Sequence, residues 1–498
     1  MDGVAIFPLI WLAENTKMCI IYYQMHLERK KPMRTNIVKI LLLAVVLAVA
    51  LTGCNLIEID PVKQMEEDIA KLDKAYAAPV ATYGDQTLTA SDVMAEFNMA
   101  YNQTYYMYYY YYGYQMTDDD AHQLMQDVLT EQVQEHIIAD HFDADGMTLT
   151  EEELADCDTQ AQSSFDEGYA SFVAEADGKT DAAKDAQART EMARMGYTKE
   201  ALTEIAVLHA KGDKVQEKLR DEITEVTDEQ LQAAYEEKVA ADAENYTTGS
   251  SAFESAMTGT TTTVYSIPEG YRTVKHILVK PEDAVLTAYK DAVSAKQSAE
   301  TKLDDLQAEL ASATDDDETT AARAEDVIKA DIADAEAALA EQEAAVKAAE
   351  QACLDDVRAT TDAIEERLAA GEDFIALMQE YGEDPGMQNE PTATRGYYVS
   401  AASTNWESNF TAAAMALQNV GDVSEPVVSG SGVHVIRYES DVTPGAVPLA
   451  DVHDALYDAT LESMKAAHYD DTVAAWVEAE APTYDAEALE KAIAEGNK

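Results

Sequence analysis

The stretches Tyr271–Lys280 (YRTVKHILVK) and Gly430–Tyr438 (GSGVHVIRY) each carry one histidine, His276 and His434, among β-branched and apolar residues. Runs of this composition predict short β-strands. Most of the sequence between them has the spacing of apolar residues that is typical of helices. We therefore expect the chain to fold so that these two strands lie side by side.

The bulk composition limits the class of protein. A chain of 498 residues is too long for one ordinary domain, so we expect two or three. Its 47% of hydrophobic residues is enough for a folded core. The formal charge of −60 argues against binding to nucleic acid and against adsorption of the folded body to anionic lipid. A solvated acidic surface is the simplest interpretation, and a preference for basic clients is the alternative.

The cysteines predict neither a metal site nor a disulfide framework. The four are Cys19, Cys54, Cys157 and Cys353, and they form no CxxC pair and have no metal-ligand spacing. We therefore expect no metal and no cofactor. Cys54 differs from the other three in the residues that surround it.

Residues 1–54 have the features of a leader. Met33 opens a positively charged beginning, and Ile40–Leu51 (ILLLAVVLAVAL) is an apolar run too short for an ordinary membrane span. The LTGC motif that follows resembles the lipobox of bacterial lipoproteins, which implies that Cys54 is acylated and begins the mature chain. The protein would then be lipid-anchored at the outer face of the bacterial cell membrane, with residues 1–32 an over-extended start or an unusual leader. A plain transmembrane anchor is the alternative.

Residues 55–245 are predicted to form a mostly helical domain. Helix starts recur at irregular spacing, for example at Thr150, where acidic residues follow the capping threonine. One predicted helix runs into Tyr105–Tyr114 (YYMYYYYYGY), and tyrosine offers a large, rigid contact surface that suits binding of unfolded polypeptide. Alternatively, half of these rings pack in the core and the rest shield a helix. The Thr-, Ser- and Gly-rich residues 246–270 lack helical periodicity and predict a linker.

Five motifs follow this linker in order. They are VKHILV at 274–279, AIEERLAAGEDFIALMQEYGED at 363–384, RGYY at 395–398, NFTAAAMAL at 409–417 and VGDVSEPVVSGSGVHVIRYES at 420–440. Together they resemble a parvulin-type peptidyl-prolyl cis/trans isomerase domain, which we place at 271–440. A lipoprotein with helical sequence on both sides of such a domain is similar to the extracytoplasmic foldases of the PrsA and SurA type.

The resemblance implies an α+β fold. A mostly helical chaperone domain, like the N-terminal domain of SurA, would accompany a parvulin domain with a four-stranded antiparallel sheet and helices. In the resembled foldases the segments before and after the isomerase fold together. We therefore expect residues 441–498 to form a helical segment that packs on the N-terminal domain.

The expected reaction explains the types of residue present. Rotation about an X-Pro bond breaks no bond and must only overcome a barrier of about 18–20 kcal/mol that resonance creates. A catalyst must hold the proline ring in an apolar pocket and favour the twisted amide over the planar one. The resemblance implies a catalytic cluster and a substrate pocket: His276, Asp384, Ser431 and His434 for the cluster, and Tyr398, Trp406 and Phe410 for the pocket.

Two features of these residues depart from the resembled family or vary within it. Trp406 and Tyr398 stand where methionine and leucine are common, which predicts a bulkier pocket and a narrower range of substrates. Some family members carry cysteine at the position of Asp384 and others aspartate. The two imidazoles are expected to hydrogen-bond each other. The alternative is a parvulin fold kept as a peptide-binding module.

The segment Pro281–Val357 departs from the resembled family, in which the first strand leads almost directly to the first helix. Two helical tracts joined by TDDDETT occupy it. In the second tract the apolar positions step by threes and fours: Ile328, Ile332, Ala335, Leu339, Val346, Ala349 and Cys353. We predict an inserted antiparallel coiled-coil hairpin that projects as an arm. Holding clients, contacting the cell wall, forming a homodimer and having no role all stay open for it.

Three hypotheses for function follow. The leading one is an extracytoplasmic, membrane-anchored foldase that isomerises X-Pro bonds in unfolded or folding secreted polypeptides and assists their folding. The second is a non-catalytic holdase chaperone that uses the parvulin fold to bind peptide. The third is a structural or adhesion lipoprotein at the cell surface. The presence of His276, Asp384, Ser431 and His434 together favours the first.

Overall fold

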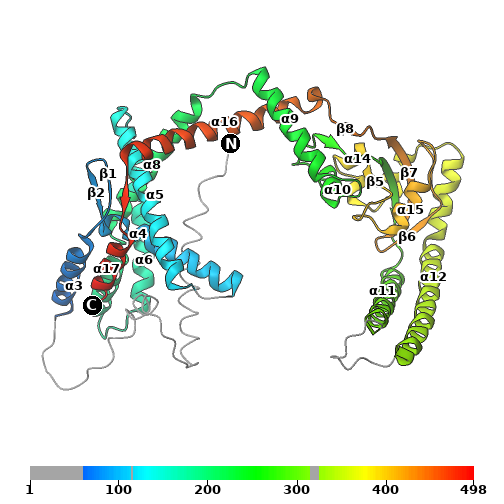
Figure 1. Cartoon of the computed structure of the whole chain (residues 1–498), viewed down its shortest axis with the longest axis horizontal. Helices are drawn as coiled ribbons and strands as arrows, with labels where there is room; N and C mark the ends of the chain where they lie inside the picture. The colour runs from blue at the N-terminus through cyan, green and yellow to red at the C-terminus, as the bar shows by residue number, and fades with distance from the viewer. Residues whose placement is uncertain (1–59, 114–115, 314–324) are drawn as a thin grey trace. The chain divides into compact units, whose positions relative to one another are not determined.

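The computed structural model describes residues 60–113, 116–313 and 325–498. The predicted leader with Cys54 and the TDDDETT connection lie outside the described residues. The contacts divide the chain into two compact units, which we describe separately (Figure 1). The helical unit comprises the chain up to Glu225 together with Leu461–Lys498, and the sheet unit is Val226–Thr460.

The helical unit is built from segments at both ends of the chain. Its elements are α3 (Pro61–Tyr76), β1 (Pro79–Tyr83), β2 (Gln86–Thr89), α4 (Ala90–Met107), a π-helix (Tyr108–Tyr112), α5 (Asp118–Ala144), α6 (Glu151–Glu175), α7 (Asp181–Arg194), α8 (Lys199–Asp221), the later part of α16 (Leu449–Glu480), β9 (Thr483–Tyr484) and α17 (Ala486–Gly496). Capping boxes begin α5 and α6, where Thr117 and Thr150 exchange hydrogen bonds with Asp120 and Glu153.

The two ends of the chain meet in one small sheet and one core. The strand order is β2-β1-β9, with all pairs antiparallel, so the last strand of the chain completes the sheet that the first two begin. Phe97 from α4, Leu129 from α5 and Leu489 from α17 are fully buried in one cluster. The helical unit therefore needs its C-terminal segment for a closed core.

The tyrosine-rich stretch forms a ladder of rings along α4 and the π-helix. The rings of Tyr101 and Tyr105 stack with centroids 6.2 Å apart, and those of Tyr106 and Tyr110 with centroids 4.3 Å apart. This i, i+4 spacing places the rings on common helix faces. Tyr111 is 79% exposed, whereas Tyr101 is half-buried against the core. Tyr101, which packs against the core, precedes the stretch, and the described rings within Tyr105–Tyr114 range from partly buried to exposed.

The sheet unit surrounds one four-stranded antiparallel sheet. Its elements are α9 (Asp228–Asn245), α10 (Ser251–Thr258), β3 (Ser266–Ile267), β4 (Tyr271–Val279), α11 (Asp283–Ala313), α12 (Glu325–Ala369), α13 (Phe374–Tyr381), a 3-10 helix (Pro385–Met387), α14 (Thr392–Arg395), β5 (Tyr397–Ser400), α15 (Ser408–Ala416), β6 (Val427–Ser429), β7 (Gly432–Asp441), β8 (Gly445–Ala446) and the beginning of α16. The strand order is β5-β4-β7-β6, so the two histidine strands are neighbours at its centre.

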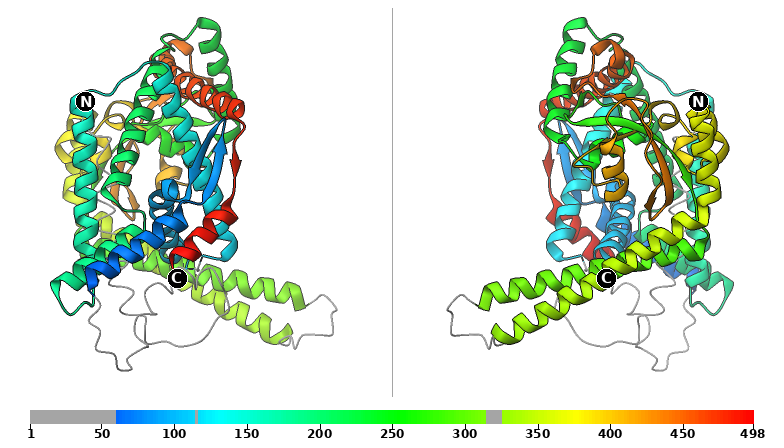
Figure 2. Two further views of the ribbon diagram at one scale, coloured as in Figure 1. Left: turned by 90° about the vertical axis from the view of Figure 1, so that its left-hand side faces the viewer. Right: turned by 90° about the vertical axis from the view of Figure 1, so that its right-hand side faces the viewer.

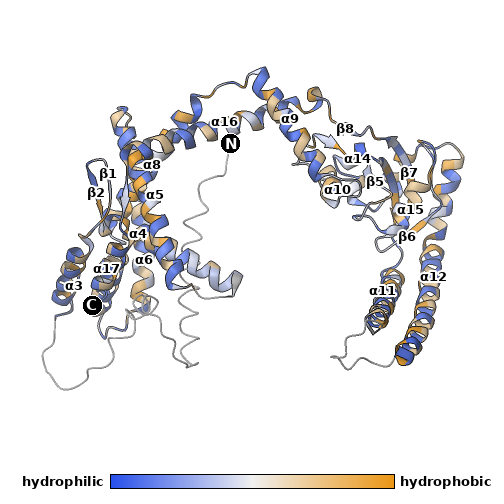
Figure 3. Ribbon diagram, in the orientation of Figure 1, coloured by the Kyte–Doolittle hydropathy of each residue, from blue (hydrophilic) through white to orange (hydrophobic). Residues whose placement is uncertain are grey.

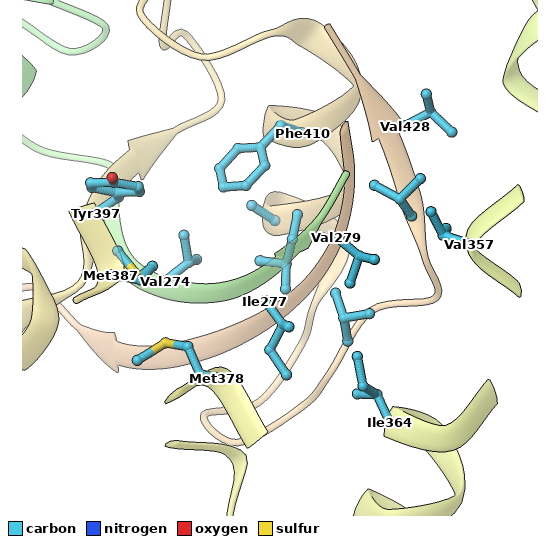
Figure 4. Close-up of a cluster of buried hydrophobic side chains, with 14 of the residues drawn as sticks. Val274, Ile277, Val279, Val357, Ile364, Met378, Met387, Tyr397, Phe410 and Val428 are labelled. Carbon is cyan, nitrogen blue, oxygen red and sulfur yellow. The ribbon is translucent and has the colours of Figure 1, made fainter. Parts of the chain in front are cut away.

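Helices cover both faces of this sheet. Ile364 of α12 and Met378 of α13 pack on one face, and Phe410 of α15 lies over the other (Figure 4). Strand β4 is buried along almost its whole length, and its Val274 and Ile277 are completely inaccessible. Both faces of this central strand are covered, so its buried polar side chains need partners: Lys275 pairs with Glu439, and His276 pairs with Asp384.

The predicted linker at 246–270 is wrong as a linker, because it folds into the sheet unit. Ser250 caps α10, which buries Phe253 completely, and the Phe253 ring packs 4.7 Å from that of Tyr271. The surrounding Thr, Ser and Gly residues hid this short apolar helix. The division between the units falls at Glu225, before α9, instead of at residue 245. The predicted C-terminal segment is also divided, with residues up to Thr460 belonging to the sheet unit.

The insertion forms two long helices that pack against each other (Figure 2). At about 1.5 Å per residue, the 31 residues of α11 extend ~46 Å. Hydrophilic residues interleave with hydrophobic ones along both helices (Figure 3), and Ile328 and Cys353 are fully buried. Helix α12 continues without a break to Ala369, so the predicted end of the insertion at Val357 is not the end of a helix. The second helix of the arm and the first helix of the parvulin pattern are one element.

Candidate functional site

His276 on β4 and His434 on β7 lie beside each other in the middle of the sheet. The register pairs His276 with Ile436 and Leu278 with His434, so the two histidines are diagonal neighbours on one face. Their Nδ1 atoms are 2.8 Å apart, and both side chains are buried. The strands alone therefore bring the two imidazoles into hydrogen-bonding contact.

Asp384 holds the His276 end of this pair. It follows α13 and caps the 3-10 helix, and its Oδ2 lies 2.8 Å from His276 Nε2. The Tyr397 hydroxyl donates to the same oxygen at 2.8 Å, and the Gly386 N–H donates to Oδ1 at 3.0 Å. Burial raises the pKa of Asp384, but the hydrogen bonds from His276, Tyr397 and Gly386 outweigh it and lower that pKa to about 2.

Ser429 holds the His434 end. Its Oγ lies 2.6 Å from His434 Nε2 and accepts a hydrogen bond from the Ser431 N–H at 3.0 Å. We expected the Ser431 hydroxyl here, but Ser431 lies in the exposed turn between β6 and β7. Val427 pairs with His434, and strand alternation puts Ser429 on the same face as Val427. Ser429 therefore takes the position that we had assigned to Ser431.

The four side chains form one continuous line of hydrogen bonds. Because ionised Asp384 only accepts, His276 must donate from Nε2. The two facing Nδ1 atoms share one hydrogen bond, and the Ser429 hydroxyl lies within hydrogen-bonding distance of His434 Nε2. Burial lowers the pKa of His434 to about 3, and the nearby His276 ring acts in the same direction. The line thus keeps His434 neutral and fixes both rings.

Aromatic side chains border this line. The Phe410 ring stands edge-on to both imidazoles, with centroids 5.4 Å from His276 and 5.1 Å from His434. The half-buried Trp406 lies 5.9 Å from Phe410 and 4.5 Å from Tyr397. Trp406 and Phe410 are therefore placed beside the polar cluster, as the substrate pocket requires.

Tyr398 lies on the opposite face of β5 and does not join them. Its ring packs edge-on against Phe253 with centroids 5.6 Å apart, and the Arg395 guanidinium lies 5.7 Å from it. Neighbouring residues on a strand point to opposite faces, so Tyr397 faces the histidines instead. Burial and the adjacent Asp384 carboxylate raise the pKa of Tyr397, which keeps its phenol protonated as a donor. The sequence has tyrosine at both 397 and 398, so it does not show which of the two faces the histidines.

Gly386 is required by the close approach of Tyr397. A Cβ at residue 386 would lie 1.8 Å from the Tyr397 hydroxyl and 2.9 Å from Cζ. The phenol can reach Asp384 because residue 386 has no side chain. Sequence reasoning missed Gly386, Tyr397 and Ser429; alternation from His434 across the GSG turn was the one available signal, and it pointed to Ser429.

Other clusters in the described ranges offer less chemistry. Across residues 60–113, 116–313 and 325–498, no group of three or more His, Cys, Asp or Glu side chains could hold a metal ion. A groove of about 600 Å³ lies between α5, α6 and α8 of the helical unit. Its two lysines pair with acidic neighbours, Lys199 with Asp158 and Lys211 with Asp143, both at 2.7 Å. Both of its lysines are therefore neutralised by carboxylates within the groove.

A histidine pair on the central strands of a four-stranded antiparallel sheet, with aspartate and serine at its two ends, defines a parvulin-type domain. The family model described as "PPIC-type PPIASE domain" (Rotamase) matches residues 343–440. The match begins within α12 and leaves out β4, from which the insertion separates it. The resemblance to parvulin-type peptidyl-prolyl isomerases and the expected fold class, a helical unit plus this sheet, are confirmed.

The particular proteins that the chain resembles are foldases named PrsA. Foldase protein PrsA 4 of Bacillus cereus is 38% identical over 78 residues, which is 16% of this chain and 26% of that protein. The match thus spans about a quarter of this relative. The crystal structure of PrsA from Bacillus subtilis has 14% identity and a TM-score of 0.18, over 81% of this chain and 93% of that one. PrsA from Streptococcus pneumoniae has 13% identity and a TM-score of 0.17, over 76% and 95%. TM-scores this low carry no structural argument.

Proposed function

We propose that this protein is a foldase that catalyses cis/trans isomerisation of X-Pro bonds in unfolded secreted polypeptides and assists their folding. The observation that carries the proposal is the hydrogen-bonded line from Asp384 through the buried His276 and His434 to Ser429, with Phe410 standing over both rings. Uncatalysed X-Pro isomerisation takes tens to hundreds of seconds, which is long enough to limit folding.

The geometry suits this reaction because it combines an apolar surface with a fixed polar one. The proline ring would rest on Phe410 and Trp406. The planar amide owes its stiffness to a resonance form with negative charge on the carbonyl oxygen. The partly buried Asp384 carboxylate opposes that charge through the fixed imidazoles, which favours the twisted amide over the planar one. No bond to the substrate forms or breaks.

The test is an isomerisation assay with the full chain on a short proline-containing peptide. Asp384→Ala and His434→Ala break the line at its end and at its middle, so each should lower kcat/KM well below that of the unaltered chain. The exposed Glu237→Ala on α9 is the matched control and should change nothing. A full chain without activity above background, or with activity that both site variants retain, would overturn the proposal.

We further propose that the protein acts outside the cytoplasmic membrane, anchored by lipid at Cys54. The LTGC motif after the apolar run supports this. In the three described ranges, no helix has both the length and the apolar character needed to span a bilayer. Cys54→Ser should release the protein from the membrane fraction and abolish labelling with a radioactive fatty acid. A variant that is still labelled and still sediments with membranes would refute the anchor.

A holdase function is a second candidate, and the exposed end of the tyrosine ladder favours it. Met107, Tyr110 and Tyr111 are 40%, 46% and 79% exposed at the end of α4 and in the π-helix. Large exposed rings provide contact area for unfolded chains at low entropic cost. Suppression of aggregation of a denatured protein, measured with Asp384→Ala and with Tyr111→Ser, separates the two roles. A holdase loses activity in the tyrosine variant and keeps it in the aspartate variant.

A further inference from the structure

Helix α10 carries a buried carboxylate that faces the loop after β5. Glu254 is 1% exposed. Its Oε1 accepts hydrogen bonds from the Tyr271 hydroxyl at 3.0 Å and from the Ser403 hydroxyl, and its Oε2 lies 3.4 Å from the Asn405 N–H. A buried carboxylate is tolerated when donors surround it, and two of these three donors come from the loop.

The same loop is attached to α10 at further points. The Asn405 side chain donates to the Ser251 carbonyl at 3.0 Å and to the Ser255 hydroxyl at 3.2 Å. Gly249 approaches the loop so closely that a Cβ there would lie 2.2 Å from the Ala402 carbonyl oxygen. The loop from Ser400 to Asn405 is therefore held to α10 by several independent contacts.

This loop ends at Trp406, one of the two aromatic residues beside the catalytic cluster. The indole Nε1 donates to the Tyr398 carbonyl at 2.8 Å, and the Tyr398 ring packs against Phe253 of α10. The loop and Tyr398 therefore both connect the indole to α10, in addition to the ring contacts of Trp406 with Tyr397 and Phe410. Helix α10 lies outside the 343–440 region that the family model matches.

We propose that α10 sets the substrate pocket and that Glu254 is a positioning residue for Trp406. The inference rests on the proposed isomerase function. Glu254 touches neither the histidines nor Asp384; it acts by fixing the loop that presents the indole. Loss of Glu254 leaves the Ser403 and Tyr271 hydroxyls without their acceptor and frees the loop. The indole then samples several positions, so the pocket binds proline less well while the hydrogen-bonded line remains.

The test uses the full chain labelled with 5-fluorotryptophan and examined by ¹⁹F NMR. The Trp406 signal is identified by its loss in Trp406→Phe, and the signal of Trp476, which stacks on His141 in the helical unit, reports on folding elsewhere. Glu254→Ala should broaden or shift the Trp406 signal and leave that of Trp476 unchanged. It should raise KM for a proline peptide about three- to tenfold with kcat within about twofold, a pattern of lost binding.

Two further variants keep the test decisive if Glu254→Ala folds poorly. Asn405→Ala removes a loop contact from an exposed side chain and should shift the Trp406 signal in the same direction by a smaller amount. Glu254→Gln keeps an acceptor for Ser403 and should restore most of the KM. An unchanged Trp406 signal in Glu254→Ala and Asn405→Ala would overturn the inference. Because the NMR signal needs no turnover, an inactive parent chain would refute the isomerase and still test the positioning role.

Discussion

The contact between Gly386 and Tyr397 gives the sharpest stability prediction. Gly→Ala in a helical conformation ordinarily stabilises a protein by about 0.4–1 kcal/mol, because the unfolded chain loses freedom. At residue 386 the added methyl would lie 1.8 Å from the Tyr397 hydroxyl, so the phenol must move away from Asp384. The charge-assisted hydrogen bond is worth about 1.5–3 kcal/mol and the overpacking about 1–3 kcal/mol. Gly386→Ala should therefore destabilise the sheet unit by roughly 2–5 kcal/mol.

A double-mutant cycle with Tyr397→Phe isolates the cause. Removing the hydroxyl takes away both the hydrogen bond and the worst part of the clash, and leaves a 2.9 Å contact to ring carbon Cζ. Gly386→Ala should then cost at least about 1 kcal/mol less in the Tyr397→Phe background than in the parent chain.

Urea unfolding measures this cycle through Trp406, because a two-unit chain needs a probe in the unit of interest. Gly259 at the end of α10 is the matched control in the same unit, since a Cβ there meets nothing closer than 3.5 Å. Gly259→Ala should be neutral or slightly stabilising. Strictly additive effects of Gly386→Ala and Tyr397→Phe, or a stabilising Gly386→Ala, would refute the account of this contact.

Three other predictions follow from the site and the arm. The pKa of Asp384 is lowered from 3.8 to about 2, so its ionised form stabilises the folded chain fully above pH ~4 and no longer does so once the pH has fallen through ~2. The free energy of unfolding should therefore drop by about 2 kcal/mol over this range in the parent chain. In Asp384→Asn it should change less with pH. Ser429→Ala should lower kcat/KM roughly tenfold, which corresponds to the loss of one neutral hydrogen bond, and Ser431→Ala should lower it less than about twofold. A larger loss in Ser431→Ala than in Ser429→Ala would return the catalytic role to Ser431. Ile328→Ala should leave a cavity that destabilises the hairpin by about 2–5 kcal/mol. Amide hydrogen exchange in α11 and α12 should then be faster, while the isomerase activity stays unchanged. Slow exchange throughout both helices would contradict the packing of the hairpin.

The sequence was sufficient for the central strands because their side-chain pattern is local. His276 and His434 stand in β-branched and apolar runs that predict strands, whereas the diagonal pairing of the two histidines is known only from the register. The predictions for Tyr398 and for residues 246–270 failed because they depend on tertiary contacts, which the composition of a stretch does not show. The choice between Tyr397 and Tyr398 requires knowing which face of β5 meets the core, and α10 is recognisable as folded only when the Phe253 ring meets Tyr271.

The position of the arm shows why the parvulin pattern survives so long an interruption. A hairpin of helices returns to its starting point, and here the two ends meet: the Glu282 N–H donates to the Asp356 side chain at 2.8 Å. The packing of α11 against α12 brings the two ends of the inserted segment together. The entropic cost of closing this long loop is therefore not borne by the pairing of the sheet strands. Helix α12 contains both Ile328 of the arm and Ile364 of the core. The arm therefore has no flexible joint where α12 passes into the domain. A ligand or a force acting on the arm would act directly on α12, which covers the catalytic sheet. Any role of the arm should therefore be visible as a change in the position of α12 on that sheet.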